Sequence, residues 1–248
     1  MPARKTPIKR KVRNWTAADS AELYGVEDWS NDYFSVSRAG EVNVHLVDTD
    51  GSTKEVSLPD IMKGLEERGT NVPVLLRFRD LLHARIDELN KSFSKAIKAA
   101  GYTGKYRGVY PIKVNQQRMV VEEVVAHGQK YHYGLEAGSK PELIAAMAYM
   151  RDAESFLMCN GYKDDEFIDL ALMGMRMGMK ICLILEMPNE LPAILRRAEV
   201  LGVEPILGVR VRLASKGSGH WSESAGDKSV FGLNAAQVID VVDTLKAA

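Results

Sequence analysis

The sequence is poor in the features that mark secreted, membrane and nucleic-acid-binding proteins. Only two of its 248 residues are cysteines, too few for a disulfide framework and without metal-ligand spacing. No apolar run approaches the length that crosses a bilayer. Basic and acidic residues both number 33, so the formal net charge is zero and does not favour binding to nucleic acid. Cys159 and Cys182 lie in apolar runs and are expected to be buried thiols in strands, which suits a reducing cytoplasm.

The amino terminus also lacks a secretory signal. Met1–Val12 is basic, contains no acidic residue and has no apolar core segment. We expect residues 1–20 to form a disordered basic tail, with organelle targeting as a minor alternative.

Residues 21–79 have the pattern of a β-rich segment. Alternating polar and apolar residues predict a hairpin over 33–47, turning at Ala39-Gly40, with a further strand over 55–58. A short helix is expected over 58–68 and another strand over 74–78.

From about residue 80 apolar strands alternate with amphipathic helices, which predicts parallel β/α units. A (β/α)8 barrel needs eight strands, and five are expected here, so the sequence predicts an incomplete TIM-type barrel over 80–248. The expected strands are 106–112, 131–136, 155–160, 180–186 and 206–212, and the expected helices are 81–100, 115–128, 139–151, 163–178, 188–202 and 234–247.

A polar residue stands at the end of each expected strand: Lys113, Glu136, Asn160, Glu186 and Arg212. Active sites of β/α barrels lie at the carboxyl ends of the strands, so these side chains are candidates for one site. Polar residues are also common there simply because loops begin at strand ends.

Lys113 is the strongest of these candidates. A lysine is rarely buried unless it is paired, and burial favours its neutral form, which is a nucleophile able to form a Schiff base with an aldehyde. The alternative is a strand-end lysine that pairs with a nearby carboxylate.

Four segments together resemble the biosynthetic arginine decarboxylases, which depend on pyridoxal phosphate and have the alanine-racemase-like fold. The resemblance extends from about Tyr24 onward. The segments, in chain order, are Val109–Gln116, Tyr133–Leu143, Met158–Glu166, and Arg212–Trp221 with Phe231–Leu233.

The resemblance implies that Lys113 carries pyridoxal 5'-phosphate, that Glu136 lies beside that link, and that Arg212 binds an anionic oxygen of cofactor or substrate. It implies the decarboxylation of L-arginine to agmatine for putrescine and spermidine synthesis. It further implies a homodimer or homotetramer, magnesium as a second cofactor, and a β domain that residues 21–79 would join. No residue pattern here indicates a magnesium site.

By the same resemblance this chain corresponds to the front part of a longer enzyme, because the family's phosphate-binding and substrate-binding residues follow later. We therefore expect little activity from the 248-residue chain alone. The family usually has lysine directly before Phe-Gly-Leu, where this sequence has Val230. The Gly- and Ser-rich stretch Ala214–Lys228 is expected to close over the site.

Helix capping is enough to explain some residues of these segments without a role in the site. Ser139 and Glu142 fit a capping box, although the resemblance also places Glu142 near the site. Asn115 is expected to cap the following helix.

Other functions stay open at this point. One is a related decarboxylase of ornithine, lysine or diaminopimelate. Another is a non-catalytic pyridoxal-phosphate-binding or regulatory homologue. A third is a nonfunctional fragment that is related to these enzymes only by descent.

Overall fold

A computed structural model describes residues 14–47, 52–212, 229 and 231–247 of the chain. It consists of two compact units, Met1–Leu81 and Leu82–Ala248, each with its own sheet. Over these described ranges, no helix has both the length and the apolar character that a membrane span requires.

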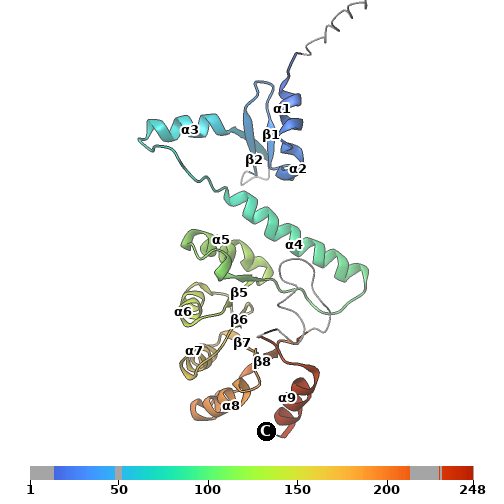
Figure 1. The fold of residues 1–248 in the computed structure, drawn as a ribbon, viewed down its shortest axis with the longest axis vertical. Helices are drawn as coiled ribbons and strands as arrows, with labels where there is room; N and C mark the ends of the chain where they lie inside the picture. Colours follow the sequence, from blue (N-terminus) through green and yellow to red (C-terminus); the bar gives the residue numbers. More distant parts are fainter. Residues whose placement is uncertain (1–13, 48–51, 213–228, 230, 248) are drawn as a thin grey trace, which may run out of the picture. The chain divides into compact units, whose positions relative to one another are not determined.

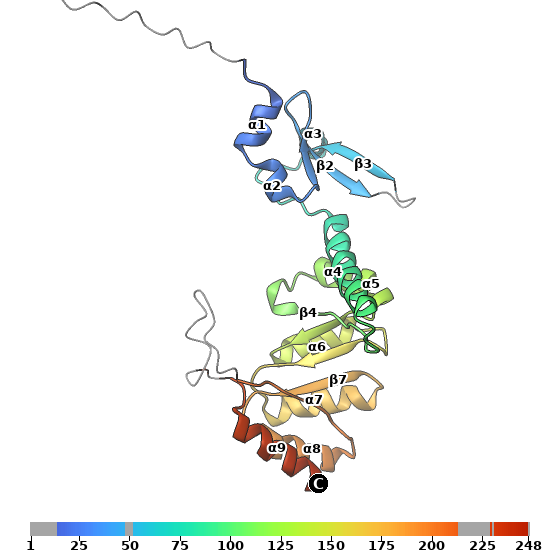
Figure 2. The ribbon, with the colours of Figure 1, turned by 90° about the vertical axis from the view of Figure 1, so that its right-hand side faces the viewer.

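The first unit is a three-stranded antiparallel sheet with helices packed on it (Figure 2). Its strands pair in the order β1-β2-β3, as the hairpin pattern predicts. Helices α1 and α2 contact β1, whereas α3 contacts β2 and β3. The elements are α1 (Ala17–Leu23), α2 (Val26–Ser30), β1 (Phe34–Val36), β2 (Val42–Val47), β3 (Thr53–Ser57) and α3 (Leu58–Glu67).

Two expectations for this unit are wrong. The unstructured tail does not reach residue 20, because Thr16 and Asp19 form a capping box that starts α1 at Ala17. Residues 1–13 lie outside the described part. Residues 74–78 keep an alternating exposure but form no strand, since no described segment pairs with their backbone.

The second unit is a five-stranded parallel sheet in the order β4-β5-β6-β7-β8, as the β/α rhythm predicts. Helices α5, α6, α7 and α8 lie in a row along one side of the strands (Figure 1). The elements are α4 (Arg79–Ala99), β4 (Val109–Pro111), α5 (Arg118–Gly128), β5 (Gly134–Ala137), α6 (Lys140–Tyr149), β6 (Phe156–Cys159), α7 (Asp165–Arg176), β7 (Lys180–Leu185), α8 (Glu190–Leu201), β8 (Ile206–Val209) and α9 (Ala235–Ala247).

The core of this unit lies between the strands and that helix row. Side chains alternate between the two faces of a strand, and alternate residues of β5, β6 and β7 are buried against helices. Both cysteines are free and buried, as expected, and burial raises the pKa of the Cys159 thiol to about 12. The strand residues in the core include Leu135, Ala137, Leu157, Cys159, Ile181, Leu183 and Leu185.

The chain around Lys113 differs in detail from the predicted strand and helix. Strand β4 spans only Val109–Pro111, and a 3-10 turn over Ile112–Val114 follows it. Helix α5 begins at Arg118, and Asn115 does not cap it. The Asn115 side chain instead accepts a hydrogen bond from the Gln117 amide at 3.0 Å. Proline at position 111 has no N–H for the ladder, which is consistent with the early end of β4.

A polar cluster joins α4 to α5 within the second unit. The rings of His83 and His127 stack with centroids 4.0 Å apart, and the Asp87 carboxylate binds His127, Lys130 and Tyr131. Burial raises the pKa of Asp87, but the hydrogen bonds from Lys130, His127 and Tyr131 outweigh burial and hold the pKa at about 2.

This cluster predicts a pH dependence of stability in acid. The pKa of Asp87 is lower in the folded chain, so its contribution is complete above the unfolded value and is lost as pH falls from about 4 to about 2. The carboxylate is 23% exposed, and after discounting for solvent screening we expect a loss of roughly 0.5 kcal/mol between about pH 5 and about pH 3. Urea unfolding at about pH 5 and about pH 3 measures it. Asp87→Asn should show a smaller loss between the two pH values, and an equal loss would contradict the assignment.

Candidate active site at the carboxyl edge of the sheet

Four of the five predicted side chains lie on the strand face that does not carry the helix-side core residues. Glu136 lies between two core residues of β5, so it points to the opposite face. The same alternation places Asn160, Glu186 and Arg212 on that face, and all three follow the carboxyl ends of strands. The sheet therefore brings these side chains to one edge.

Lys113, Glu136 and Asn160 form a connected group at this edge. The Lys113 Nζ lies 3.5 Å from Oε1 of Glu136, whose side chain is only 5% exposed. The Asn160 amide nitrogen donates to the same oxygen at 3.1 Å. In-register pairing of β4, β5 and β6 brings the three together although they are far apart in sequence.

Lys113 is not buried, which corrects the expectation from burial statistics. Its side chain is 62% exposed, because it stands on the 3-10 turn beyond the end of β4. The hydroxyl of Tyr110 holds that turn by donating to the Asn115 carbonyl at 3.2 Å. The amine is therefore accessible to a ligand and pairs with a buried carboxylate.

Glu142 stands next to this group and is fully hydrogen-bonded. Its Oε2 accepts from the Gly138 amide at 2.8 Å, and its Oε1 accepts from the Gln116 side chain at 2.9 Å. Ser139 caps α6 by accepting from the Glu142 amide, as predicted. The Glu142 carboxylate, however, binds Gly138 and not the cap residue itself, so only half of the capping box forms.

Glu186 links the turn after β6 to the end of β8 at the same edge. Its carboxylate, 1% exposed, accepts from the Gly161 amide at 3.0 Å and pairs with the Arg210 guanidinium at 3.0 Å. Arg210 also lies over the Phe231 ring, 5.6 Å from its centroid. Sequence reasoning missed Arg210. The alternation of residues 210 and 212 was the available signal, because both side chains face the same way.

Arg212 lies at the same edge and is held in part by the backbone of the chain. Its guanidinium donates to the Gly232 carbonyl at 3.0 Å, and the adjacent backbone pairs Val211 with Leu233. The expected closing stretch 214–228, together with Val230, lies outside the described residues.

Sequence reasoning also missed a buried ion pair next to this edge. Lys163 and Glu190 lie 3.5 Å apart with side chains 0% and 1% exposed. The burial that we predicted for Lys113 is therefore found at Lys163. Lys163 lies in the loop after β6 and Glu190 begins α8, so the pair leaves no local sequence signal.

Two buried polar atoms at this edge have no hydrogen-bond partner among the described residues, Oε2 of Glu136 and Nε of Arg212. Such atoms cost free energy unless a ligand satisfies them. A ligand with a hydrogen-bond donor and an anionic oxygen would suit an acid and an arginine, and the exposed Lys113 amine could bond to it covalently.

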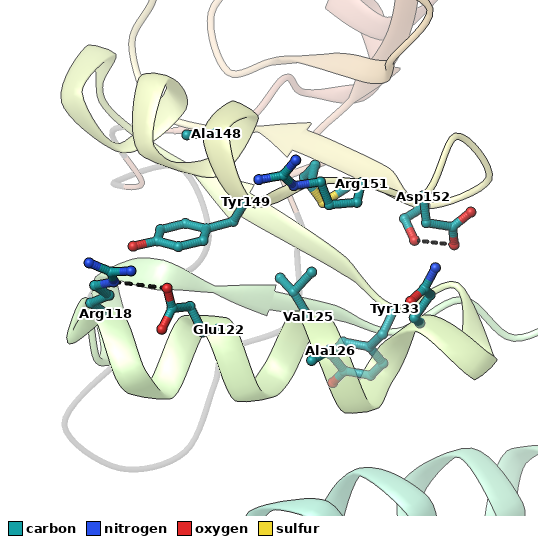
Figure 3. A pocket seen from close by; sticks show the side chains of 12 residues that line it. Arg118, Glu122, Val125, Ala126, Tyr133, Ala148, Tyr149, Arg151 and Asp152 are labelled. Carbon is teal, nitrogen blue, oxygen red and sulfur yellow. Dashed lines mark hydrogen bonds and ion pairs between the residues drawn. The ribbon is translucent and has the colours of Figure 1, made fainter.

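A cavity of about 540 Å3 lies elsewhere, between α5 and α6 (Figure 3). Two pairs involve its charged lining residues, Arg118 with Glu122 and Asp152 with Ser155. None of the predicted site residues lines it. The chemistry of the strand edge therefore does not belong to this cavity.

No cluster of three or more histidine, cysteine, aspartate or glutamate side chains suited to a metal ion occurs within the described ranges. The edge offers an amine, two buried carboxylates and two guanidinium groups. Such groups suit a ligand that carries both an anionic group and a hydrogen-bond donor.

Comparison with known proteins agrees with this chemistry. Residues 84–248 match the family model described as pyridoxal-dependent decarboxylase, pyridoxal binding domain. The biosynthetic arginine decarboxylase of Marinobacter nauticus is 48% identical over 237 residues, which is 94% of this chain and 37% of that protein. The chain thus spans little more than a third of this relative.

Two solved structures are also similar. The biosynthetic arginine decarboxylase of Campylobacter jejuni has 37% identity and a TM-score of 0.78, over 90% of this chain and 35% of that chain. A diaminopimelate decarboxylase from M. jannaschi has 19% identity and a TM-score of 0.63, over 88% of this chain and 44% of that chain. The second likeness concerns the fold alone.

The unequal satisfaction of Glu136 and Glu142 predicts opposite responses to the same substitution. Glu136→Gln removes a buried charge with one unpaired oxygen and keeps an acceptor for Asn160, so the free energy of unfolding should stay equal or rise by up to about 1 kcal/mol.

Glu142→Gln is the matched control, because both oxygens of Glu142 already accept hydrogen bonds. It should lower the free energy of unfolding by about 1–2 kcal/mol. Urea titrations of both variants measure the difference, and a larger loss for Glu136→Gln would contradict this assignment.

Proposed function

The chain belongs to the pyridoxal-dependent decarboxylases, and from this membership we propose that Lys113 carries pyridoxal 5'-phosphate and that the protein decarboxylates L-arginine to agmatine. Agmatine would serve putrescine and spermidine synthesis. In the domain organisation that we propose, residues 80–248 form the cofactor-binding barrel portion and residues 21–79 contribute to a β domain. A homo-oligomer in the cytoplasm is part of the same proposal.

The observation that carries the proposal is the pair of Lys113 and Glu136. An exposed primary amine lies 3.5 Å from a nearly buried carboxylate at the edge where β/α proteins bind substrates. A carboxylate at this distance attracts a positively charged nitrogen. The same pairing would support a positively charged nitrogen after the amine has bonded to an aldehyde.

The other edge residues have roles that follow from their charge. The free oxygen of Glu136 can accept a hydrogen bond from the bound molecule. Arg212 has an unpaired buried Nε, which is suited to an anionic oxygen of cofactor or substrate. When bound, pyridoxal phosphate supplies an electron sink for the charge that develops at the α-carbon during decarboxylation.

The choice of arginine as substrate rests on the relatives. The Marinobacter and Campylobacter proteins are both named biosynthetic arginine decarboxylases, at 48% and 37% identity. The diaminopimelate decarboxylase is similar only in fold, at 19% identity. Arginine is therefore favoured over diaminopimelate, ornithine and lysine.

The attachment of the cofactor can be tested on the purified chain. We expect a visible absorption band after mixing with pyridoxal phosphate, and borohydride reduction should leave the label on Lys113 in peptide maps. Lys113→Ala should abolish both signals, because it removes the amine. Lys180→Ala is the control, since Lys180 begins β7 at the opposite end of the strands and pairs with Glu154. A band that persists in Lys113→Ala would refute the assignment.

The substrate can be tested by the products released. With pyridoxal phosphate present, we expect the longer enzyme that contains this chain to release agmatine from L-arginine in preference to the amines formed from ornithine, lysine or diaminopimelate, and we expect little release from the 248-residue chain alone. Carbon dioxide release with each amino acid measures this preference. Preferential release from one of the other three would reject arginine while leaving the cofactor assignment intact.

A further inference from the structure

The Lys163 ammonium is completely enclosed behind the candidate site. Its side chain is 0% exposed and follows the Asn160-Gly161 turn at the end of β6. The Nζ donates to the carbonyls of Gly161 at 2.7 Å and Ile184 at 2.5 Å, and it lies 3.5 Å from Glu190. An ammonium has three donors, so these three acceptors satisfy it completely.

The Glu190 carboxylate is satisfied to the same degree. Its Oε1 accepts from both the backbone and the side chain of Lys163, and its Oε2 accepts from the amides of Glu186 at 2.7 Å and Met187 at 3.3 Å. Glu190 is also the first residue of α8, where the helix dipole favours a negative charge. The pair therefore ties the loop after β6 to the turn after β7.

The hydrogen bonds of Lys163 and those of Glu190 both reach residues at the edge of the candidate site. Gly161, whose carbonyl binds Lys163, donates its amide to the Glu186 carboxylate at 3.0 Å. Glu186, whose amide binds Glu190, pairs through its side chain with Arg210. The Glu186 carbonyl also accepts from the Gly232 amide at 2.9 Å.

Burial of this kind costs free energy. Desolvation lowers the pKa of Lys163, and the nearby carboxylates of Glu190 and Glu186 oppose that shift. Buried ion pairs can often be replaced by apolar residues without loss of stability. Stability alone therefore does not explain why charged groups occupy this place, whereas their bonds to the backbone of the site loops do.

We infer that Lys163 and Glu190 are positioning residues that fix Glu186, and through it Arg210, at the edge where Lys113 and Glu136 lie. They do not touch the candidate ligand site. They hold the backbone of the loop after β6 and the turn after β7, which together form the wall of that site. The inference deepens the proposed function and rests on it, because the wall would then face the cofactor and the substrate.

The test uses Lys163→Met, Glu190→Gln and the double variant, with Ile194→Val as the control in the buried face of α8. Native-state hydrogen exchange reports the amides of Gly161 and Gly232, and exchange at the Leu183 amide in β7 is the internal reference. We expect both single variants to speed exchange at Gly161 and Gly232 by about tenfold or more relative to Leu183, as loss of hydrogen bonds to charged groups would produce.

The double variant separates positioning from stability. Removing both charges should recover much of the global stability lost in Lys163→Met. Exchange at Gly161 and Gly232 should nevertheless stay fast, because the bonds to the loop backbone are not restored. Recovery of slow exchange together with stability, or the same fast exchange in Ile194→Val, would overturn the inference.

The affinity for pyridoxal phosphate tests whether the loops held by Lys163 and Glu190 support cofactor binding. We expect pyridoxal phosphate to bind the single and double variants about tenfold more weakly than the unsubstituted chain, as loss of supporting contacts around a bound group typically produces. Unchanged affinity with unchanged exchange would refute the positioning role. Failure of the proposed function would instead appear as no label on Lys113 in the unsubstituted chain, and the exchange result would still be readable.

Discussion

The parallel hydrogen bonding of β4 through β8 determines where every candidate site residue lies. Each strand runs in the same direction, so all five carboxyl ends meet at one edge. The alternation of side chains then divides each strand between the helix-side core and the opposite face. Glu136 faces away from the core because its neighbours Leu135 and Ala137 are committed to that core. A shift of one residue in register would exchange these roles.

Charge at this edge is arranged from the inside outward. Lys163 and Glu190 are completely buried and satisfy each other and the loop backbone. Glu186 is buried and pairs with the more exposed Arg210, and Glu136 is buried and pairs with the exposed Lys113. The outermost groups are the cations, which a negatively charged ligand would meet first.

The two lysines illustrate how tertiary structure distributes chemical roles. Lys113 lies on a 3-10 turn beyond its strand and keeps an accessible amine, whereas Lys163 is enclosed by three acceptors. Only the first is suited to form a bond with a ligand, because the second cannot be reached without breaking the loop structure. Two buried polar atoms at the same edge, Oε2 of Glu136 and Nε of Arg212, have no hydrogen-bond partner among the described residues.

The sequence by itself determined the β/α order, the five parallel strands and the strand-end positions of Lys113 and Glu136, because hydrophobic periodicity is a local property. Its four motifs also led to the family that the comparisons show. It could not determine the exposure of Lys113, the pairing of Glu186 with Arg210, or the Lys163–Glu190 ion pair. The two pairings join residues that lie 24 and 27 positions apart, and only the register of neighbouring strands brings such residues together. The exposure of Lys113 follows from the 3-10 turn that replaces the end of the expected strand.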